Sequence, residues 1–451
     1  MPSYPAGFWL VAAYLAFIFL TGGGAREDIQ SLVVLRPIAV LASAWALLHL
    51  QKTDLSEYRT LLLLLLASMA VCIVHLIPLP PAAWQALPYR DLIERIDDAA
   101  GLGDVWRPLS IAPRRTLNAL FALFVPLSVL LMAARLDGRQ LRGLLGPIIL
   151  IGLLSGLVGL LQLTSGSGSA LYFYRIHNEG SAVGFFANRN HQAALLATLF
   201  PMLAVYAARP VRTLPEYRLH VIFASAAGLV LVSLLLVTGS RAGLLLGLVG
   251  LASIPFLHAR PPIENEPRRR GDRPFPVVPV ALGGAAVVLL MLIGILLSRA
   301  DAYARLVAGD QLQDVRLTTF RPVFDMVWAY FPFGSGIGSF VEAYYRDEPR
   351  ALLSPSYLNH AHNDLLEIAV TGGVLGLTLV GVVAAIWLSW TFRVWRRRSV
   401  GSYDVRVARM AAVVIGMLLA ASLVDYPLRT PSLSALLIIA AIWLRNGLKP
   451  R

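Results

Sequence analysis

The sequence predicts an all-α polytopic membrane protein of about twelve transmembrane helices, with a large outside loop before the tenth. Of its 451 residues, 57% are apolar and only 14% are charged, whereas about 25% are charged in an ordinary soluble domain. The mean hydropathy is +0.67, and apolar runs of spanning length recur along nearly the whole chain. These numbers exclude a soluble enzyme, and they exclude a disordered chain, which needs low hydrophobicity.

The apolar runs give the expected helices in chain order, at roughly 20 residues for each span. They cover residues 7–23, 31–50, 60–79, 116–136, 143–163, 191–208, 220–240, 242–258, 276–298, 365–390, 408–424 and 432–444. No basic residue precedes the first run, so we expect it to be a true span and not a cleaved signal peptide.

The distribution of basic residues predicts the orientation. The densest clusters, PRRRGDR and RVWRRR, lie in short loops, which we place inside together with both termini. Loops 80–115, 164–190 and 299–364 then lie outside, and the DLIERIDDAAGL stretch of the first is expected to form a short interfacial helix. We divide the chain into N-terminal transmembrane helices (1–180) and a transmembrane core (181–451).

Composition also limits the chemistry. The only cysteine, Cys72, sits in an apolar run, which excludes disulfides, cysteine-based zinc sites and iron–sulfur ligation. Of the 39 basic residues only Lys52 and Lys449 are lysines, so the net charge of +13 is carried by arginine. Arginine supplies planar forks that bind phosphate with two hydrogen bonds.

Four outside segments carry polar residues at the membrane face, where they are costly and point to function. They are GFFANRNHQAA (184–194), TGSRAG (238–243), RLTTFRPVFDMVWAYFPFGSGIGSF (316–340) and NHAHNDLLEIAVTGGVLG (359–376). Three of them precede spans that run inward, so three helix N-termini are expected to face one outer space. Asp364 and Glu367 resemble a capping box, which predicts a helix start at about residue 364. Helix N-termini bind phosphate, so we expect a lipid phosphate or diphosphate there.

Single residues within these segments have competing interpretations. His362 is the strongest candidate, because an imidazole that titrates near pH 6.5 suits general-base work. Arg189 and Arg241 either bind the anion or merely anchor helix ends by snorkelling. Arg316 and Arg321 either bind it or are solvated in a polar loop.

The fourth segment places Gly373 and Gly376 nine residues after the His362-Asn363 pair. This H-N-x9-G-x-x-G spacing resembles the signature of the O-antigen ligase and polymerase superfamily, multi-span bacterial enzymes that act on undecaprenyl-diphosphate-linked glycans at the periplasmic face. The G-x-F-x-N-x-N-H-x-A segment, the GSRAG turn and the stretch from Arg321 to Phe340 also resemble the superfamily in the same order. The resemblance covers about residues 184–380 by motif and the rest by span pattern.

The resemblance implies a metal-independent, inverting membrane glycosyltransferase of the bacterial inner membrane, without a cofactor. It implies that His362 is the essential periplasmic histidine and Arg241 the conserved arginine. A second arginine is implied in the large loop, with Arg321 fitting best and Arg316 as the alternative; Arg189 matches less closely. We also expect substrate contacts from the neighbouring residues Asn190, His360 and Asn363.

The implied partners are an undecaprenyl-diphosphate-linked glycan donor, a lipid A-core or other glycan acceptor, and the bilayer, with no nucleic acid. Ligation of O-antigen to lipid A-core is the preferred reaction. Repeat-unit polymerisation and transfer to protein hydroxyls remain alternatives, since relatives with those activities share the motifs. A lipid-linked glycan flippase is the non-enzyme alternative. It is disfavoured because transporters place polar residues in mid-span, whereas here they gather at one face.

Overall fold

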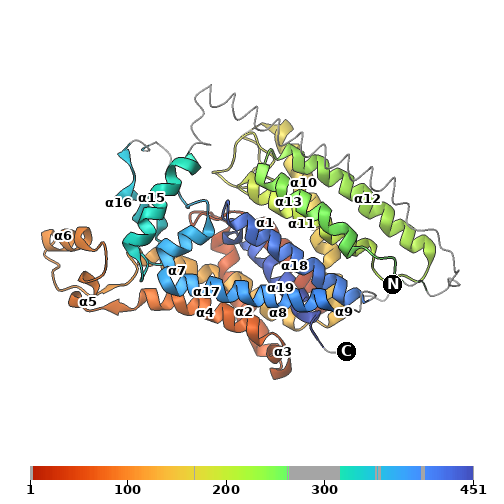
Figure 1. Ribbon diagram of the computed structural model, residues 1–451, viewed down its shortest axis with the longest axis horizontal. Helices are drawn as coiled ribbons and strands as arrows, with labels where there is room; N and C mark the ends of the chain where they lie inside the picture. The colour runs from red at the N-terminus through yellow and green to blue at the C-terminus, as the bar shows by residue number, and fades with distance from the viewer. Residues whose placement is uncertain are drawn as a thin grey trace.

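The computed structural model describes residues 4–449 apart from 167, 262, 264–314, 351–352, 354–356 and 398–401. Within this part the chain is mostly helical and has almost no strand, as expected (Figure 1). The helices of the N-terminal half are α1 (Ala6–Thr21), α2 (Leu32–His49), α3 (Lys52–Glu57), α4 (Arg59–Leu76), α5 (Pro81–Gln85), α6 (Asp91–Ala99), α7 (Pro113–Ala122), α8 (Phe124–Ala134), α9 (Gly138–Gly143) and α10 (Leu145–Ser165).

The C-terminal half begins with a helix that is mostly buried. Its elements are α11 (Arg189–Ala207), α12 (Leu214–Val237), α13 (Arg241–Leu257), α15 (Val315–Tyr330), α16 (Phe340–Asp347), α17 (Asp364–Arg396), α18 (Tyr403–Ser422), the 3₁₀ turn η2 (Pro427–Arg429) and α19 (Pro431–Asn446). The strands are β1 (Pro78–Leu79) and β2 (Arg107–Pro108), which pair antiparallel.

Helices suited to a membrane lie where the apolar runs predicted them. In the described residues seven helices are long and apolar enough to span, and α1, α13 and α19 are shorter apolar helices. The polar start of α11 lowers its hydropathy, yet nearly all of its residues are buried, as expected for a helix that is apolar all round. The predicted ninth span, 276–298, lies outside the described residues, so a total of twelve remains a prediction.

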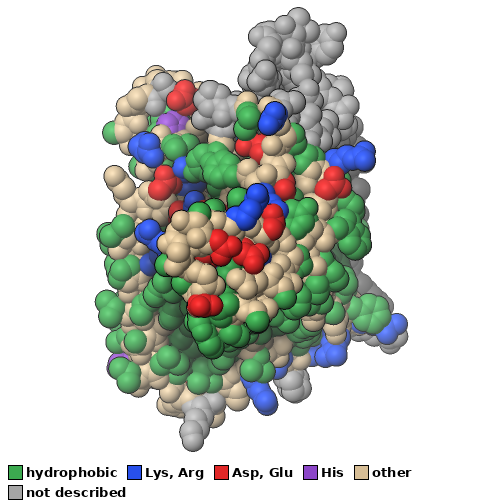
Figure 2. Space-filling model, turned by 90° about the vertical axis from the view of Figure 1, so that its left-hand side faces the viewer, with side chains coloured by type: hydrophobic (Ala, Val, Ile, Leu, Met, Phe, Trp, Pro, Cys, Tyr) green, Lys and Arg blue, Asp and Glu red, His purple; other side chains and the backbone are tan. Residues whose placement is uncertain are grey.

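Both termini lie at one end of the bundle, and α5, α6 and α16 lie at the other (Figure 1). The helix predicted in the DLIERIDDAAGL stretch is present as α6, and its position at the membrane interface stays a prediction. Seen from that end, acidic and basic side chains gather over the centre of the surface, while the flanks are largely hydrophobic (Figure 2). The arrangement fits a bundle whose sides face lipid and whose polar side chains gather at one end.

The large loop before the tenth predicted span is more structured than we expected. Arg316 and Arg321 are not in a polar loop; both lie in α15. This helix buries Val323, Met326 and Tyr330 against α16 and α17, at the three-to-four-residue spacing of one helical face. The prediction of a polar loop was wrong because the arginines and threonines make the segment look polar, although its apolar residues recur on one helical face.

The segment between α15 and α16 docks on the backbone of α17. Ser335 and Gly336 donate to the carbonyls of Val370 and Thr371 at 2.9 Å, and Val374 donates back to Pro332 at 2.8 Å. Gly373 adopts φ +54° inside α17, where an added Cβ would lie 2.2 Å from the Pro332 carbonyl oxygen. The glycine pattern of the motif therefore shapes a docking site between two backbones.

Candidate functional site

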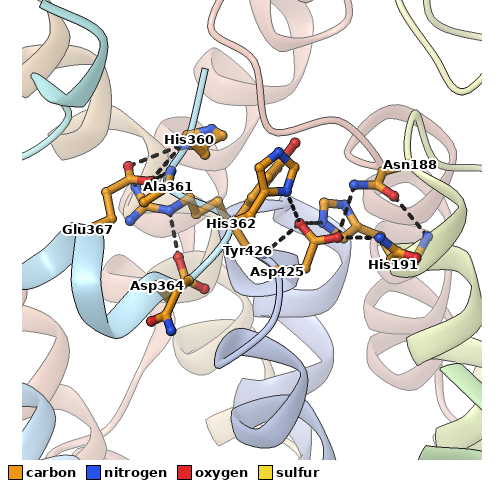
Figure 3. A network of polar contacts seen from close by, with 12 residues as sticks. Asn188, His191, His360, Ala361, His362, Asp364, Glu367, Asp425 and Tyr426 are labelled. Atoms are coloured by element: carbon orange, nitrogen blue, oxygen red, sulfur yellow. Dashed lines mark hydrogen bonds and ion pairs between the residues drawn. The ribbon is translucent and has the colours of Figure 1, made fainter. Parts of the chain in front are cut away.

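A carboxylate that the sequence analysis did not single out lies at the centre of the polar cluster (Figure 3). Asp425 follows α18, and its side chain is 4% exposed. Its Oδ1 lies 3.1 Å from Nδ1 of His362 and accepts the backbone N–H of Tyr426 at 3.1 Å. Its Oδ2 accepts from the amide of Asn190 at 2.6 Å and from Asn188 at 3.4 Å. A buried carboxylate with this many donors is held as an anion in one position.

These contacts bring the predicted helix N-termini together. Asn188 caps α11, Ser240 caps α13 and Asn363 caps α17. The Ser240 hydroxyl donates to the side chain of Asn190 at 2.8 Å, which joins α13 to α11. Asp425 contacts both Asn190 and His362, and so joins α11 to the residue that precedes the N-cap of α17. The convergence of the three N-termini is confirmed. An anion does lie among them, but it is a side chain of the protein itself.

His362 is held in an unusual backbone conformation beside this carboxylate. Its φ is +51°, a region that residues other than glycine seldom adopt and that is enriched at functional sites. Because an ionised carboxylate can only accept, the contact with Asp425 favours the tautomer of a neutral His362 in which Nδ1 carries the proton and Nε2 the lone pair. The ring is 22% exposed. The Nδ1 edge of the imidazole thus contacts a buried carboxylate, while part of the side chain is exposed at the surface.

Three imidazoles surround the ring of Tyr426. The ring centroids of His191, His360 and His362 lie 5.0, 4.3 and 5.1 Å from that of Tyr426. His191 also places Nε2 3.9 Å from Asp425 Oδ1. Tyr426 therefore acts as a packed spacer that keeps the histidines of α11 and of the segment before α17 at fixed separations.

A second network lies beside the first and involves a further unpredicted residue, Arg429. Its guanidinium contacts Asp364 at 2.6 Å and Glu367 at 3.0 Å. Glu367 is 1% exposed and also contacts His360 at 3.1 Å and the backbone N–H of Ala361 at 2.9 Å. Burial opposes the charge on Arg429, but the two carboxylates outweigh it and raise its pKa. This network fixes the start of α17 against η2.

The helix start at Asp364 is as expected, but the predicted capping box is wrong. The cap is Asn363, whose side chain accepts from the backbone N–H of Leu366 at 3.0 Å and donates to the Leu423 carbonyl at 3.0 Å. Asp364 and Glu367 turn to Arg429 instead, because a buried guanidinium is a stronger partner than a backbone N–H.

The predicted arginines lie in two groups. Arg189 and Arg241 are the first residues of α11 and α13 and are half-buried; Nη1 of Arg189 lies 3.7 Å from the place of a Cβ on Gly239, in the turn before Arg241. Arg321 is exposed on α15, and no hydrogen bond or ion pair links it to the described members of the Asp425 network. Arg316 is in the same helix.

Residues 226–381 match the family model of the O-antigen ligases. This segment is an O-antigen ligase domain. It includes Arg241, Arg321, His362 and the Gly373 docking point. No curated protein matches the chain. The match supports an assignment to the O-antigen ligase superfamily and a membrane glycosyltransferase of the ligase or polymerase type.

Asp425, Tyr426 and Arg429 lie beyond the O-antigen ligase domain, in a short turn between two apolar runs. The signal that points to them is the same one that selected the four polar segments, since DYPLR places three polar residues between two apolar runs, at a membrane face. The signal is weak, because the turn is only a few residues long. Asn188 and Ser240 were inside segments that we did select, but as caps they gave no separate signal.

Proposed function

We propose that the chain transfers a glycan from undecaprenyl diphosphate to an acceptor hydroxyl at the periplasmic face of the inner membrane, and that the acceptor is lipid A-core. The observation that carries the proposal is the pair of His362 and Asp425 among three helix N-termini, two of which begin with arginine. This combination offers a base for a hydroxyl and a pocket for a phosphorylated leaving group within one cluster.

His362 acts as the general base. Asp425 keeps the proton on Nδ1, so Nε2 takes the proton from the acceptor hydroxyl as its oxygen attacks the anomeric carbon. The imidazolium that forms is then stabilised by the same carboxylate, as in a Ser-His-Asp arrangement. The new bond joins the acceptor oxygen to the anomeric carbon.

The diphosphate leaves as the new bond forms. The bond between the anomeric carbon and the diphosphate oxygen breaks, and its electrons remain on the undecaprenyl diphosphate. Arg241 and Arg189, with the N–H groups of α11 and α13, stabilise that charge. Arg321 supplies a further fork from α15, with Arg316 as the alternative. A single in-line displacement inverts the anomeric configuration, and a leaving group that is already anionic needs no general acid.

The test is a transfer assay with the purified chain and a defined undecaprenyl-diphosphate glycan. Lipid A-core, a second copy of the repeat unit and a serine-containing peptide are supplied as acceptors in parallel. We expect product only with lipid A-core. Product with the repeat unit or the peptide alone replaces the ligase proposal by a polymerase or a protein glycosyltransferase, and labelled lipid crossing liposomes without transfer replaces it by a flippase.

His362→Ala should lower turnover by roughly 10²–10⁴-fold in the same assay. His49→Ala is the matched control, because His49 is exposed at the C-terminal end of α2 and its ring contacts the carbonyl and the ring of Trp45 in the same helix. Near wild-type turnover of the His362 variant, with the control equally active, would remove His362 from the mechanism and leave His360 as the next candidate.

A further inference from the structure

A cavity of about 490 Å³ lies at the end of the bundle opposite the site described above. It is lined by Thr60, Trp390, Arg393, Arg397, Arg445 and Leu448. Three of these six residues are arginines, and none is acidic. They come from three separate parts of the chain, namely the start of α4, the end of α17 and the end of α19.

The arginines are held in place by different neighbours. Arg397 donates to the carbonyls of Lys449 and Leu448 at 2.9 and 2.7 Å. Arg445 lies 6.0 Å from the Trp390 ring. Glu57, just before α4, forms an ion pair with Lys449, so its charge is already matched. Among the described residues that line the cavity, positive charge therefore converges with no carboxylate to balance it.

We propose that this cavity binds the phosphate headgroup of an anionic phospholipid in the inner leaflet. Guanidinium forks recognise phosphate oxygens in pairs, and basic pockets between transmembrane helices on the cytoplasmic side bind anionic headgroups. The volume lies within the range of ordinary small-molecule sites. Trp390 provides an aromatic ring of the kind that sits at headgroup level.

The surroundings favour a lipid over a soluble phosphate. Leu63 on α4 and Leu388 on α17 are 52% and 57% exposed, on the same two helices that bound the cavity. In a bilayer these surfaces face hydrocarbon, so a headgroup in the cavity leaves its acyl chains against them. The general preference for arginine in cytoplasmic loops accounts for basic residues at this end. It does not account for their convergence on one cavity.

The experiment measures lipid binding to the full chain in detergent by native mass spectrometry, with phosphatidylglycerol against phosphatidylcholine. The test variant is Arg393→Gln/Arg445→Gln, which spares the carbonyl contacts of Arg397. The control is Arg218→Gln/Arg396→Gln, which removes two exposed arginines that do not line the cavity. Each arginine near a charged membrane surface contributes roughly fivefold in affinity, so the test variant should bind phosphatidylglycerol ~25-fold more weakly.

We expect the control variant to bind phosphatidylglycerol as tightly as the wild type does. Phosphatidylcholine should bind the wild type and both variants equally weakly. An equal loss in both variants would show that only net charge matters and would overturn the site, as would equal binding of the two lipids by the wild type. Inorganic phosphate is the third arm. If it displaces phosphatidylglycerol at millimolar concentration, the ligand is a soluble anion and the lipid assignment falls. Glycan transfer is not a readout here, so the result is independent of the proposed function.

Discussion

At the scale of single residues, the site depends on a histidine whose orientation is set by its neighbours. His362 has a left-handed backbone and one ring nitrogen on a buried carboxylate. Neither property can be read from the sequence around it, because Asp425 is 63 positions further on. Asp425 is a positioning residue in this scheme, since it acts on the substrate only through the imidazole.

Asp425→Asn should therefore impair turnover more than binding. The amide keeps the size of the carboxylate but no longer stabilises an imidazolium, so we expect kcat to fall on the order of 10²–10⁴-fold while the KM for the donor stays within about threefold. Asp404→Asn, which alters an exposed ion pair with Arg142, is the control. A rise in donor KM at constant kcat would instead place Asp425 in substrate binding.

The arginines should be needed as forks and not only as positive charges. A diphosphate presents paired oxygens that a guanidinium grips with two hydrogen bonds, whereas lysine offers a point charge. We expect Arg241→Lys and Arg321→Lys each to lose most transfer activity, with a higher donor KM; Arg316→Lys belongs in the series as the alternative to Arg321. Arg396→Lys is the control. Full activity in all three variants would contradict the diphosphate pocket.

At the scale of elements, much of the arrangement follows from helix ends. The segment after α15 docks on α17 at Gly373, and η2 docks on the start of α17 through Arg429. The sequence predicted where α17 begins, but it did not predict that Asp364 and Glu367 would serve a tertiary ion pair. Local patterns identify an N-terminus well. They do not reveal which distant charge competes for its first-turn side chains.

Gly373→Ala should destabilise the protein, because the added Cβ would meet the Pro332 carbonyl and the φ of +54° would become strained. We expect a loss of about 1–3 kcal/mol from the backbone conformation alone. It is measured as a lower midpoint of thermal unfolding in detergent. Gly381→Ala in the same helix is the control, since nothing lies within 4 Å of its added Cβ. It should be neutral or slightly stabilising. Equal effects at both positions would argue against the docking role.

At the scale of the whole molecule, polar chemistry is separated from the lipid-facing sides. The Asp425 network lies at the opposite end of the bundle from the arginine-lined cavity, and the two termini lie together (Figure 1). The composition allows this division, because few charged residues are available and most lie outside the spans. In the proposed mechanism the anionic donor is bound at one end of the bundle, through arginines and helix ends.

Transfer should therefore survive exhaustive treatment with EDTA. The sequence has a single cysteine and no outside HExxH motif or acidic pair at metal spacing, and the proposed pocket neutralises the diphosphate by itself. We expect activity within about twofold of the untreated enzyme, measured with the same donor and lipid A-core. Loss on chelation that magnesium or manganese restores would refute a metal-free mechanism.

The sequence by itself determined the helical membrane architecture, the positions of the spans within the described residues and the four segments that carry polar residues. It could do so because burial in lipid imposes a local requirement, a continuous apolar run, on each helix. Tertiary structure alone decided that Asp425 contacts the imidazole of His362. It also decided that Arg429 forms ion pairs with Asp364 and Glu367, and that α15 is a packed helix. These are partnerships between residues far apart in the chain. No local pattern specifies them, because a buried charge is satisfied by whichever partner the packing of the helices brings within reach.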